Sequence, residues 1–265
     1  MSVNTIQALV LRYLYLYTRT PIRMVELVFW PFVHLLVWGY LTMFLQENTG
    51  DDFPYEITYL IGAVILWDVM FRAHQGVSIY FLEDVWSRNL LNVFAAPVTN
   101  GEYLASTYVV GILRAAITST LLVALSLLLY AFNIFRLDWF LIPFVFNLLL
   151  FGWGLGMLST ALIVRWGPAA ETLAWAVPFF IQPFAAVFYP VSGLPVPMQW
   201  ASKMVPCSYI FEGMREVLQS GEAPVRELVL ATSMNFLFLG GAGVLFLRVM
   251  QVARKKALLT KFSTQ

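Results

Sequence analysis

The 265-residue chain is 60% hydrophobic and only 12% charged, about half the charged fraction of an ordinary soluble domain. This balance excludes a soluble globular protein and indicates an integral membrane protein. The net charge of +1 gives no basis for binding nucleic acid, and the single cysteine, Cys207, excludes an intrachain disulfide and a cysteine-based metal site.

The first segment, residues 1–23, repeats large apolar residues at helical spacing and also carries arginine and tyrosine. That pattern is typical of a helix lying in the membrane surface. Apolar runs long enough to cross a bilayer follow at 24–46, 57–80, 103–131, 139–164, 169–188 and 228–250. The sequence therefore predicts an all-α, polytopic membrane protein with six transmembrane helices in a single domain, residues 1–265.

Among the polar side chains inside these expected spans, five are candidate site residues: Glu26, His34, Asp68, Arg72 and Arg114. Charged groups at membrane depth usually face the protein interior or a wet cavity. Asp68 and Arg72 lie four residues apart, so they share one helix face and can neutralise each other. Two interpretations stay open: a structural ion pair that orients the helix, and a polar site on a transport pathway.

A polar stretch, residues 82–102, interrupts the apolar sequence between the second and third spans. Its apolar residues keep a spacing compatible with a short amphipathic helix. Pro97 ends that helix, and Thr99 and Asn100 can cap the next one. We expect a helix over 83–97 at the membrane surface, either as a handle for a soluble partner or as a loop helix without one.

The fourth expected span contains Gly152 and Gly156, a Gly-x-x-x-Gly pair that lets another helix approach closely. A dinucleotide fingerprint would need a preceding strand and a third glycine in register. Because the sequence has neither, the pair predicts helix packing.

The stretch 189–220 is rich in proline yet remains apolar. Proline removes backbone donors and ends helices, which excludes a straight span, while the large apolar side chains argue against a solvated loop. We expect short re-entrant helices between spans five and six, acting as an outer gate. The candidate gate residues are Pro190, Gly193, Pro195, Pro206, Glu212 and Arg215.

The distribution of basic residues predicts the orientation. With the N-terminus in the cytoplasm, ten of the 16 Lys and Arg residues fall on the cytoplasmic side, four outside and two within spans. Basic residues favour the cytoplasmic side. Both termini and the 82–102 stretch are therefore expected on the cytoplasmic side of the cytoplasmic (inner) membrane, and 189–227 on the outer side.

The sequence contains no phosphate-cradling Gly-x-x-x-x-Gly-Lys-Ser/Thr motif. The chain is therefore not expected to be an enzyme, and any ATP chemistry would belong to another polypeptide.

The chain resembles the membrane subunits of type 2 ABC exporters, which are six-span permeases for drugs, lipids and polysaccharides. The resemblance covers nearly the full length. It rests on the N-terminal surface helix, on residues 83–89 running to 96–98, on 188–191 with 194–195, and on 204–206 with 212–215.

This resemblance implies a permease that exports an amphipathic, lipid-like, drug-like or glycan cargo from the cytoplasm or inner leaflet. In such families the loop between spans two and three is a coupling helix docked on a nucleotide-binding subunit. The resemblance also implies two ATPase copies, which bind ATP and Mg²⁺. A second permease copy completes the unit, which is either a homodimer or a pair of similar permeases. The permease itself is expected to bind no cofactor or metal. The residues implied at the ATPase contact are Glu83, Asp84, Trp86, Arg88, Asn89, Asn92, Phe94 and Pro97.

Two other functions are alternatives. A secondary transporter driven by an ion gradient would use Glu26, His34, Asp68 and Arg72 as a relay, and would carry an inverted repeat, which we do not find in the sequence. A non-transporting membrane assembly factor would show no substrate-stimulated hydrolysis in its complex.

Overall fold

The computed structural model describes residues 1–49, 58–167 and 170–255, and every regular element in these ranges is a helix. Residues 57 and 169, at the starts of two expected spans, lie outside the described residues. The elements are α1 (Val3–Arg19), α2 (Pro21–Thr49), α3 (Thr58–Trp86), α4 (Leu90–Ala95), α5 (Asn100–Tyr130), the 3-10 helix η2 (Ile134–Phe140), α6 (Leu141–Trp166), α7 (Leu173–Ile181), the 3-10 helices η4 (Gln182–Phe184) and η5 (Val191–Gly193), α8 (Val196–Lys203), α9 (Pro206–Ser220) and α10 (Val225–Lys255).

Four segments of the described chain are long and apolar enough to cross a membrane: α2, α5, η2 with α6, and α10. Helix α3 has the length, 29 residues, but it is not among these four, and it carries Asp68, Arg72, His74 and Gln75 in its middle turns. Helix α7 and η4 together form a shorter apolar segment. The count of six spans therefore stays a prediction, with α3 and α7 as the remaining two.

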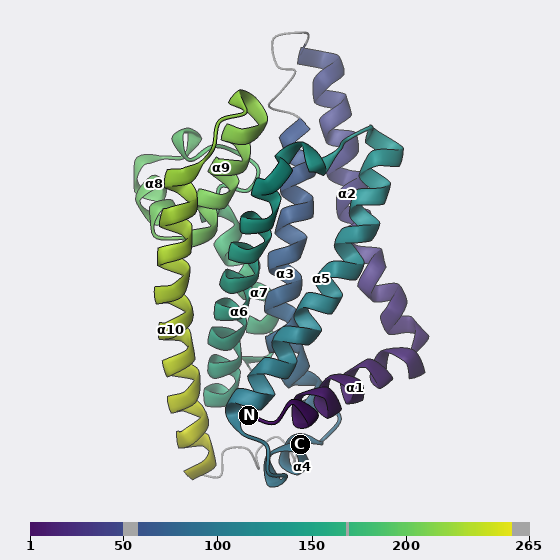
Figure 1. The fold of residues 1–265 in the computed structure, drawn as a ribbon, viewed down its shortest axis with the longest axis vertical. Coiled ribbons are helices and arrows are strands. Elements are labelled where there is room, and N and C mark those ends of the chain that lie inside the picture. The colour runs from purple at the N-terminus through teal and green to yellow at the C-terminus, as the bar shows by residue number, and fades with distance from the viewer. Residues whose placement is uncertain (50–57, 168–169, 256–265) are drawn as a thin grey trace.

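Helix α3 is the central helix of the bundle and packs between α5 and α6 (Figure 1). Every residue from Tyr59 to Asp84 is buried except Phe71, which is half-buried. A helix that is covered on all sides does not have to be apolar towards lipid, because its polar groups can find partners on its neighbours. This position explains how α3 can carry Asp68, Arg72, His74 and Gln75 in its middle turns.

Glycines allow the close approach of α3 to its two neighbours. A Cβ atom on Gly76 would lie 2.5 Å from the Cα of Gly111 on α5, and one on Gly152 of α6 would lie 2.5 Å from the carbonyl oxygen of Met70. A Cβ on Gly156 would lie 2.7 Å from the Cβ of Val77. The predicted packing role of Gly152 and Gly156 is confirmed, and α3 is the helix that they admit.

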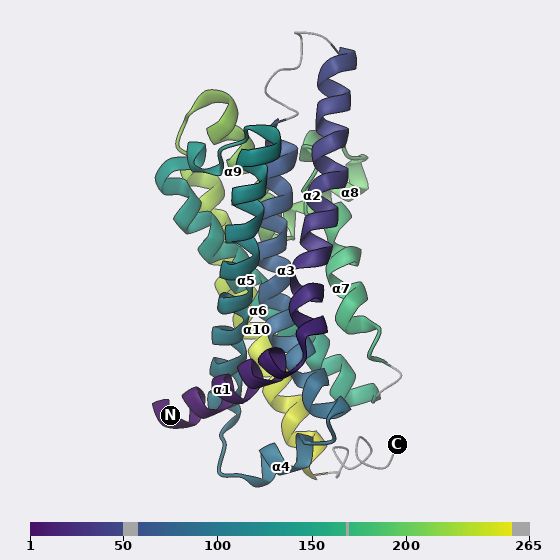
Figure 2. The ribbon, with the colours of Figure 1, turned by 90° about the vertical axis from the view of Figure 1, so that its right-hand side faces the viewer.

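The two ends of the bundle carry different elements. Helices α1 and α4 and the last turns of α10 lie at one end, which we call the α4 end; η2, α8 and α9 lie at the other, the α8 end (Figures 1 and 2). Helix α1 runs across the bundle rather than along it (Figure 2). This is the orientation that a helix in the membrane surface requires.

The expected single helix over 83–97 is divided in the structure. Helix α3 continues to Trp86, a turn follows, and α4 is only six residues long. The hydroxyl of Ser87 donates a hydrogen bond of 2.7 Å to the carbonyl of Glu83, and Arg88 adopts a left-handed φ of 53°, so the helix ends there. Thr99 caps α5 as predicted, in a capping box with Glu102.

The prolines of the 189–220 stretch begin helices. Pro190 and Pro195 precede η5 and α8, and Pro206 is the first residue of α9, where its missing N–H costs nothing. Gly193 is the last residue of η5, where its backbone N–H donates to the carbonyl of Pro190 at 3.0 Å, so the chain turns tightly there without a positive φ. Re-entry of these helices into the membrane stays a prediction.

Replacing Gly152 with alanine should destabilise the bundle by about 1–3 kcal/mol, because the new methyl group overlaps the backbone of α3. The matched control is Gly240→Ala on α10, where no atom lies within 4 Å of the added Cβ. Thermal unfolding of the purified protein in detergent is the measurement. Equal melting temperatures for the two variants would contradict the proposed close approach.

Candidate functional site

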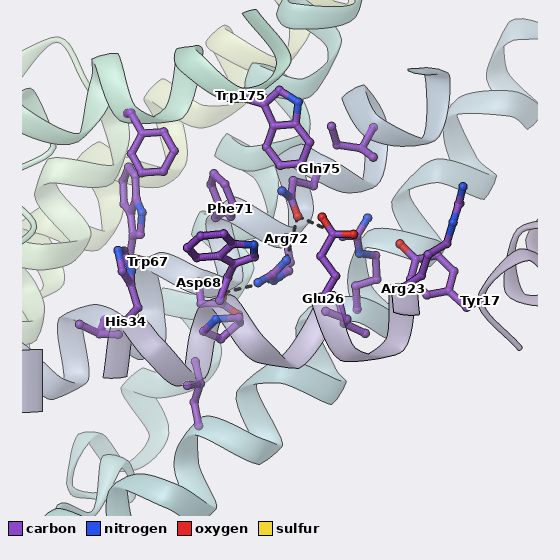
Figure 3. A pocket seen from close by; sticks show the side chains of 18 of the residues that line it. Tyr17, Arg23, Glu26, His34, Trp67, Asp68, Phe71, Arg72, Gln75 and Trp175 are labelled. Atoms are coloured by element: carbon purple, nitrogen blue, oxygen red, sulfur yellow. Dashed lines mark hydrogen bonds and ion pairs between the residues drawn. The ribbon is translucent and has the colours of Figure 1, made fainter. Parts of the chain in front are cut away.

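A cavity of about 640 Å³ lies between α2, α3 and α7, with further side chains from α1 and α5 in its wall (Figure 3). Its lining follows α3 from Val64 to Trp86. The five intramembrane candidate residues all line it: Glu26, His34, Asp68, Arg72 and Arg114. The structure therefore brings together, in one site, candidate side chains from three helices, α2, α3 and α5.

A hydrogen-bonded network forms one wall of the cavity. Arg72 Nε donates to Asp68 Oδ1 at 3.2 Å, and Arg72 Nη1 donates to Gln75 Oε1 at 2.9 Å. Arg114 Nη2 donates to the same Gln75 oxygen at 3.1 Å. The Thr118 hydroxyl donates to Asp68 Oδ2 at 2.5 Å. Both carboxylate oxygens are thus occupied, and the network joins α3 to α5.

Helix α1 reaches the same network. Arg114 Nη1 donates to the hydroxyl of Tyr13 at 3.3 Å, and the guanidinium lies 5.7 Å from the ring centre of Tyr17. Tyr13, Tyr17, Gln75 and Thr118 were not predicted as site residues. The contacts of Tyr13 with Arg114 and of Thr118 with Asp68 join different helices, so a single-sequence pattern carries no signal for them. Gln75 lies three residues after Arg72 on α3, and this helical spacing is the signal that could have indicated it.

Glu26 and His34 occupy the opposite wall, on α2. His34 is half-buried, whereas Glu26 is exposed, and in Figure 3 its carboxylate points into the cavity. Among the described residues no ion pair forms with Glu26, so its charge remains available to a molecule in the cavity.

Two ion pairs close the α4 end of the site. Arg23 of α2 lies 2.5 Å from Glu83, and Arg12 of α1 lies 2.6 Å from Asp84. The Tyr103 hydroxyl of α5 also donates to Asp84 at 3.0 Å. Burial alone would lower the pKa of the Arg12 guanidinium, but the charge of Asp84 and a hydrogen bond with Tyr80 raise it above its ordinary value, so Arg12 stays charged.

These contacts change the interpretation of the polar stretch. Glu83 and Asp84 are buried against arginines of the same chain, so they tie α1, α2 and α3 together. Among its described side chains, the exposed residues of the stretch are instead Trp86, Ser87, Arg88, Asn92, residues 95–97, Thr99 and Gly101, with Asn89 half-buried beside Asn92. The side chain of Phe94 lies outside the described residues.

Arg215 clamps the chain beyond α7, at the α8 end. Its Nη2 donates to the carbonyl oxygens of Ala186, of Val187 at 3.3 Å and of Tyr189 at 2.8 Å. Glu212 accepts from Arg215 Nη1 at 3.1 Å and from the backbone N–H of Val191 at 2.6 Å. The two predicted gate residues thus satisfy backbone groups of the segment between η4 and η5 and of the first residue of η5.

Single substitutions Asp68→Asn and Arg72→Met should each lower the folded yield, because the remaining ion stays buried at a cost of several kcal/mol. The double variant should recover part of the loss. Monodisperse yield after detergent extraction is the measurement. Simply additive losses in this double-mutant cycle would show that the two side chains do not interact.

The family model described as ABC-2 type transporter matches residues 4–218, whereas a comparison with curated proteins found no match. The matched residues include α1, the cavity lining, the polar stretch and most of α9. The chain therefore belongs to the ABC-2 type transporter family, and it is a multi-pass integral membrane protein that forms the permease component of an ABC transporter rather than its ATPase.

Proposed function

We propose that the protein is the permease subunit of an exporter that moves an amphipathic cargo, lipid-like, drug-like or glycan, out of the cytoplasm or the inner leaflet. The observation that carries this proposal is the cavity, which follows α3 from Trp86 at the α4 end to Val64. Its wall combines exposed aromatic rings with charged groups. Such a lining suits a cargo that has both apolar and polar parts.

The energy comes from a separate ATPase subunit, present in two copies, which binds ATP and Mg²⁺. We place its docking surface on the exposed residues of the polar stretch: Trp86, Arg88, Asn92 and Pro97. An exposed tryptophan beside an arginine is a composition enriched in protein interfaces. The α4 end faces the cytoplasm in this proposal, in agreement with the basic residues Arg19, Arg88 and Arg165 there.

Movement of the docked ATPase would reach the cavity directly. The turn at Ser87 and Arg88 follows directly on the last residue of α3, and α3 lines the cavity from Val64 to Trp86. The ion pair between Arg12 of α1 and Asp84 couples α1 to the end of α3, so α1 would move together with it. ATP binding shifts the transporter between states only if the ATPase favours one arrangement of these helices over another.

A second copy of the permease completes the transporter, as a homodimer or a pair of similar chains. We place it on the side where α2 and α7 border the cavity, because both present large apolar side chains outward, including Trp30, Val37 and Phe180. The cargo then lies between the copies. Glu212 and Arg215 hold the outer gate at the α8 end.

The double variant Trp86→Ala/Arg88→Glu should weaken association with the cognate ABC ATPase at least about tenfold, because it removes the aromatic contact and reverses the charge. The matched control is Trp139→Ala/Arg136→Glu, an exposed tryptophan and arginine on η2 at the opposite end. Co-purification and ATP-dependent transport into inverted vesicles are the measurements.

Unchanged assembly and transport in the Trp86/Arg88 variant would exclude this docking surface. Transport that persists without any ATPase would favour the secondary transporter.

Single cysteines in a Cys207→Ser background test the orientation and the gate. A membrane-impermeant thiol reagent added outside intact cells should label exposed Ser192→Cys and Lys203→Cys, and spare buried Ser202→Cys and Ser208→Cys. Ser87→Cys, exposed at the α4 end, should react only after the cells are permeabilised. Uniform rapid labelling from 191 to 212 would mean an open aqueous loop and no gate.

A further inference from the structure

The cavity contains three carboxylates and three guanidiniums, but they are not equally open to a ligand. Arg23 pairs with Glu83, and Arg72 pairs with Asp68. Arg114 is 9% exposed and uses its two terminal nitrogens on Tyr13 and Gln75. The carboxylate of Glu26 differs from all of these, because it is exposed and forms no ion pair within the described residues.

Aromatic rings surround the space that Glu26 faces. Trp30 of α2 is 61% exposed, and Trp175 and Phe179 of α7 are 38% and 48% exposed, although all three line the cavity. The ring of Phe71 is already engaged, since the guanidinium of Arg72 lies 5.8 Å from its centre. The other three rings offer faces that no cation of the described chain occupies.

We propose that this cavity binds organic cations that carry rings, with the Glu26 carboxylate as the counter-ion and Trp30, Trp175 and Phe179 as the surrounding walls. An aromatic ring attracts a cation through its electron-rich face, and a carboxylate supplies the charge that such a ligand needs when it leaves water. The volume, about 640 Å³, falls within the range of about 300–1,000 Å³ typical of ligand pockets.

An anionic ligand fits the site less well. To pair with Arg72 it would have to replace Asp68, and to pair with Arg23 it would have to replace Glu83. To bind Arg114 it would have to take the N–H donors that already bind Tyr13 and Gln75. Each exchange would strand a buried charge or polar group. A cation at Glu26 displaces no interaction of the described residues.

This inference deepens the proposed export function, since the cation would be the cargo or the ionic part of it. Binding itself can be measured without the ATPase. Tetraphenylphosphonium and tetraphenylborate are suitable probes, because they have nearly the same size and rings and opposite charge. The purified full-length permease in nanodiscs should bind radiolabelled tetraphenylphosphonium saturably and bind tetraphenylborate at least about tenfold more weakly.

The variant Glu26→Gln should weaken tetraphenylphosphonium binding at least about tenfold and remove the preference for the cation. Glu47→Gln is the matched control, because Glu47 is an exposed carboxylate on the same helix outside the cavity lining. Trp175→Leu should also weaken binding, whereas Trp200→Leu on α8 should not. If Glu26→Gln does not fold, the comparison of Trp175→Leu with Trp200→Leu and the comparison of the two ions still test the inference.

Equal binding of both ions, or an unchanged affinity in Glu26→Gln, would overturn the inference. Co-purification with the ATPase separates this result from the proposed function. Assembly and ATP-driven transport without cation binding would refute only the cation site. Cation binding without ATPase association would support the site and refute the proposed exporter.

Discussion

The architecture depends on keeping the charges of α3 paired inside a membrane protein. An isolated ion at membrane depth is costly, and Asp68 and Arg72 avoid that cost only while Thr118 of α5 and Gln75 stay in place. This requirement holds α3 at the centre of the bundle. The glycines of α5 and α6 then permit backbone contact on both sides. The same helix is therefore both a deeply buried element of the core and a wall of the cavity, so that any movement of α3 changes the shape of the cavity.

Helix α1 contacts the core of the bundle as well as lying across its end. Its neighbouring residues Arg12 and Tyr13 contact Asp84 at the end of α3 and Arg114 in the cavity wall. At its start, the backbone N–H of Ser2 donates to Glu102 in the cap of α5 at 2.6 Å. One helix that runs across the bundle thus touches the ends of two bundle helices and the polar network between them. A displacement at the α4 end would reach the network through α1 as well as through α3.

Local patterns made much of this predictable. Hydropathy indicated the long helices, Gly152 and Gly156 indicated a packed interface, and the spacing of Asp68 and Arg72 indicated their pairing, because each signal lies within one helix. The sequence did not reveal the contacts of Tyr13 with Arg114, whose positions are 101 residues apart. It also suggested outward-facing Glu83 and Asp84, although α3 extends past the expected span and turns both carboxylates toward arginines of α1 and α2. Charge alone does not distinguish an exposed carboxylate from one with an intramolecular partner.

Arginine clamps both ends of the molecule, but the two clamps have different consequences when they open. At the α4 end, Arg12 and Arg23 bind side chains, so separating these pairs leaves every helix with its own backbone hydrogen bonds. At the α8 end, Arg215 binds the carbonyls of Ala186, Val187 and Tyr189, which no helix satisfies. Its withdrawal would leave these groups without donors, a cost of about 1–3 kcal/mol for each buried group. Opening at the α8 end therefore requires that water or the cargo donates hydrogen bonds to these carbonyls when Arg215 leaves. Rearrangement at the α4 end requires only new partners for the charged side chains.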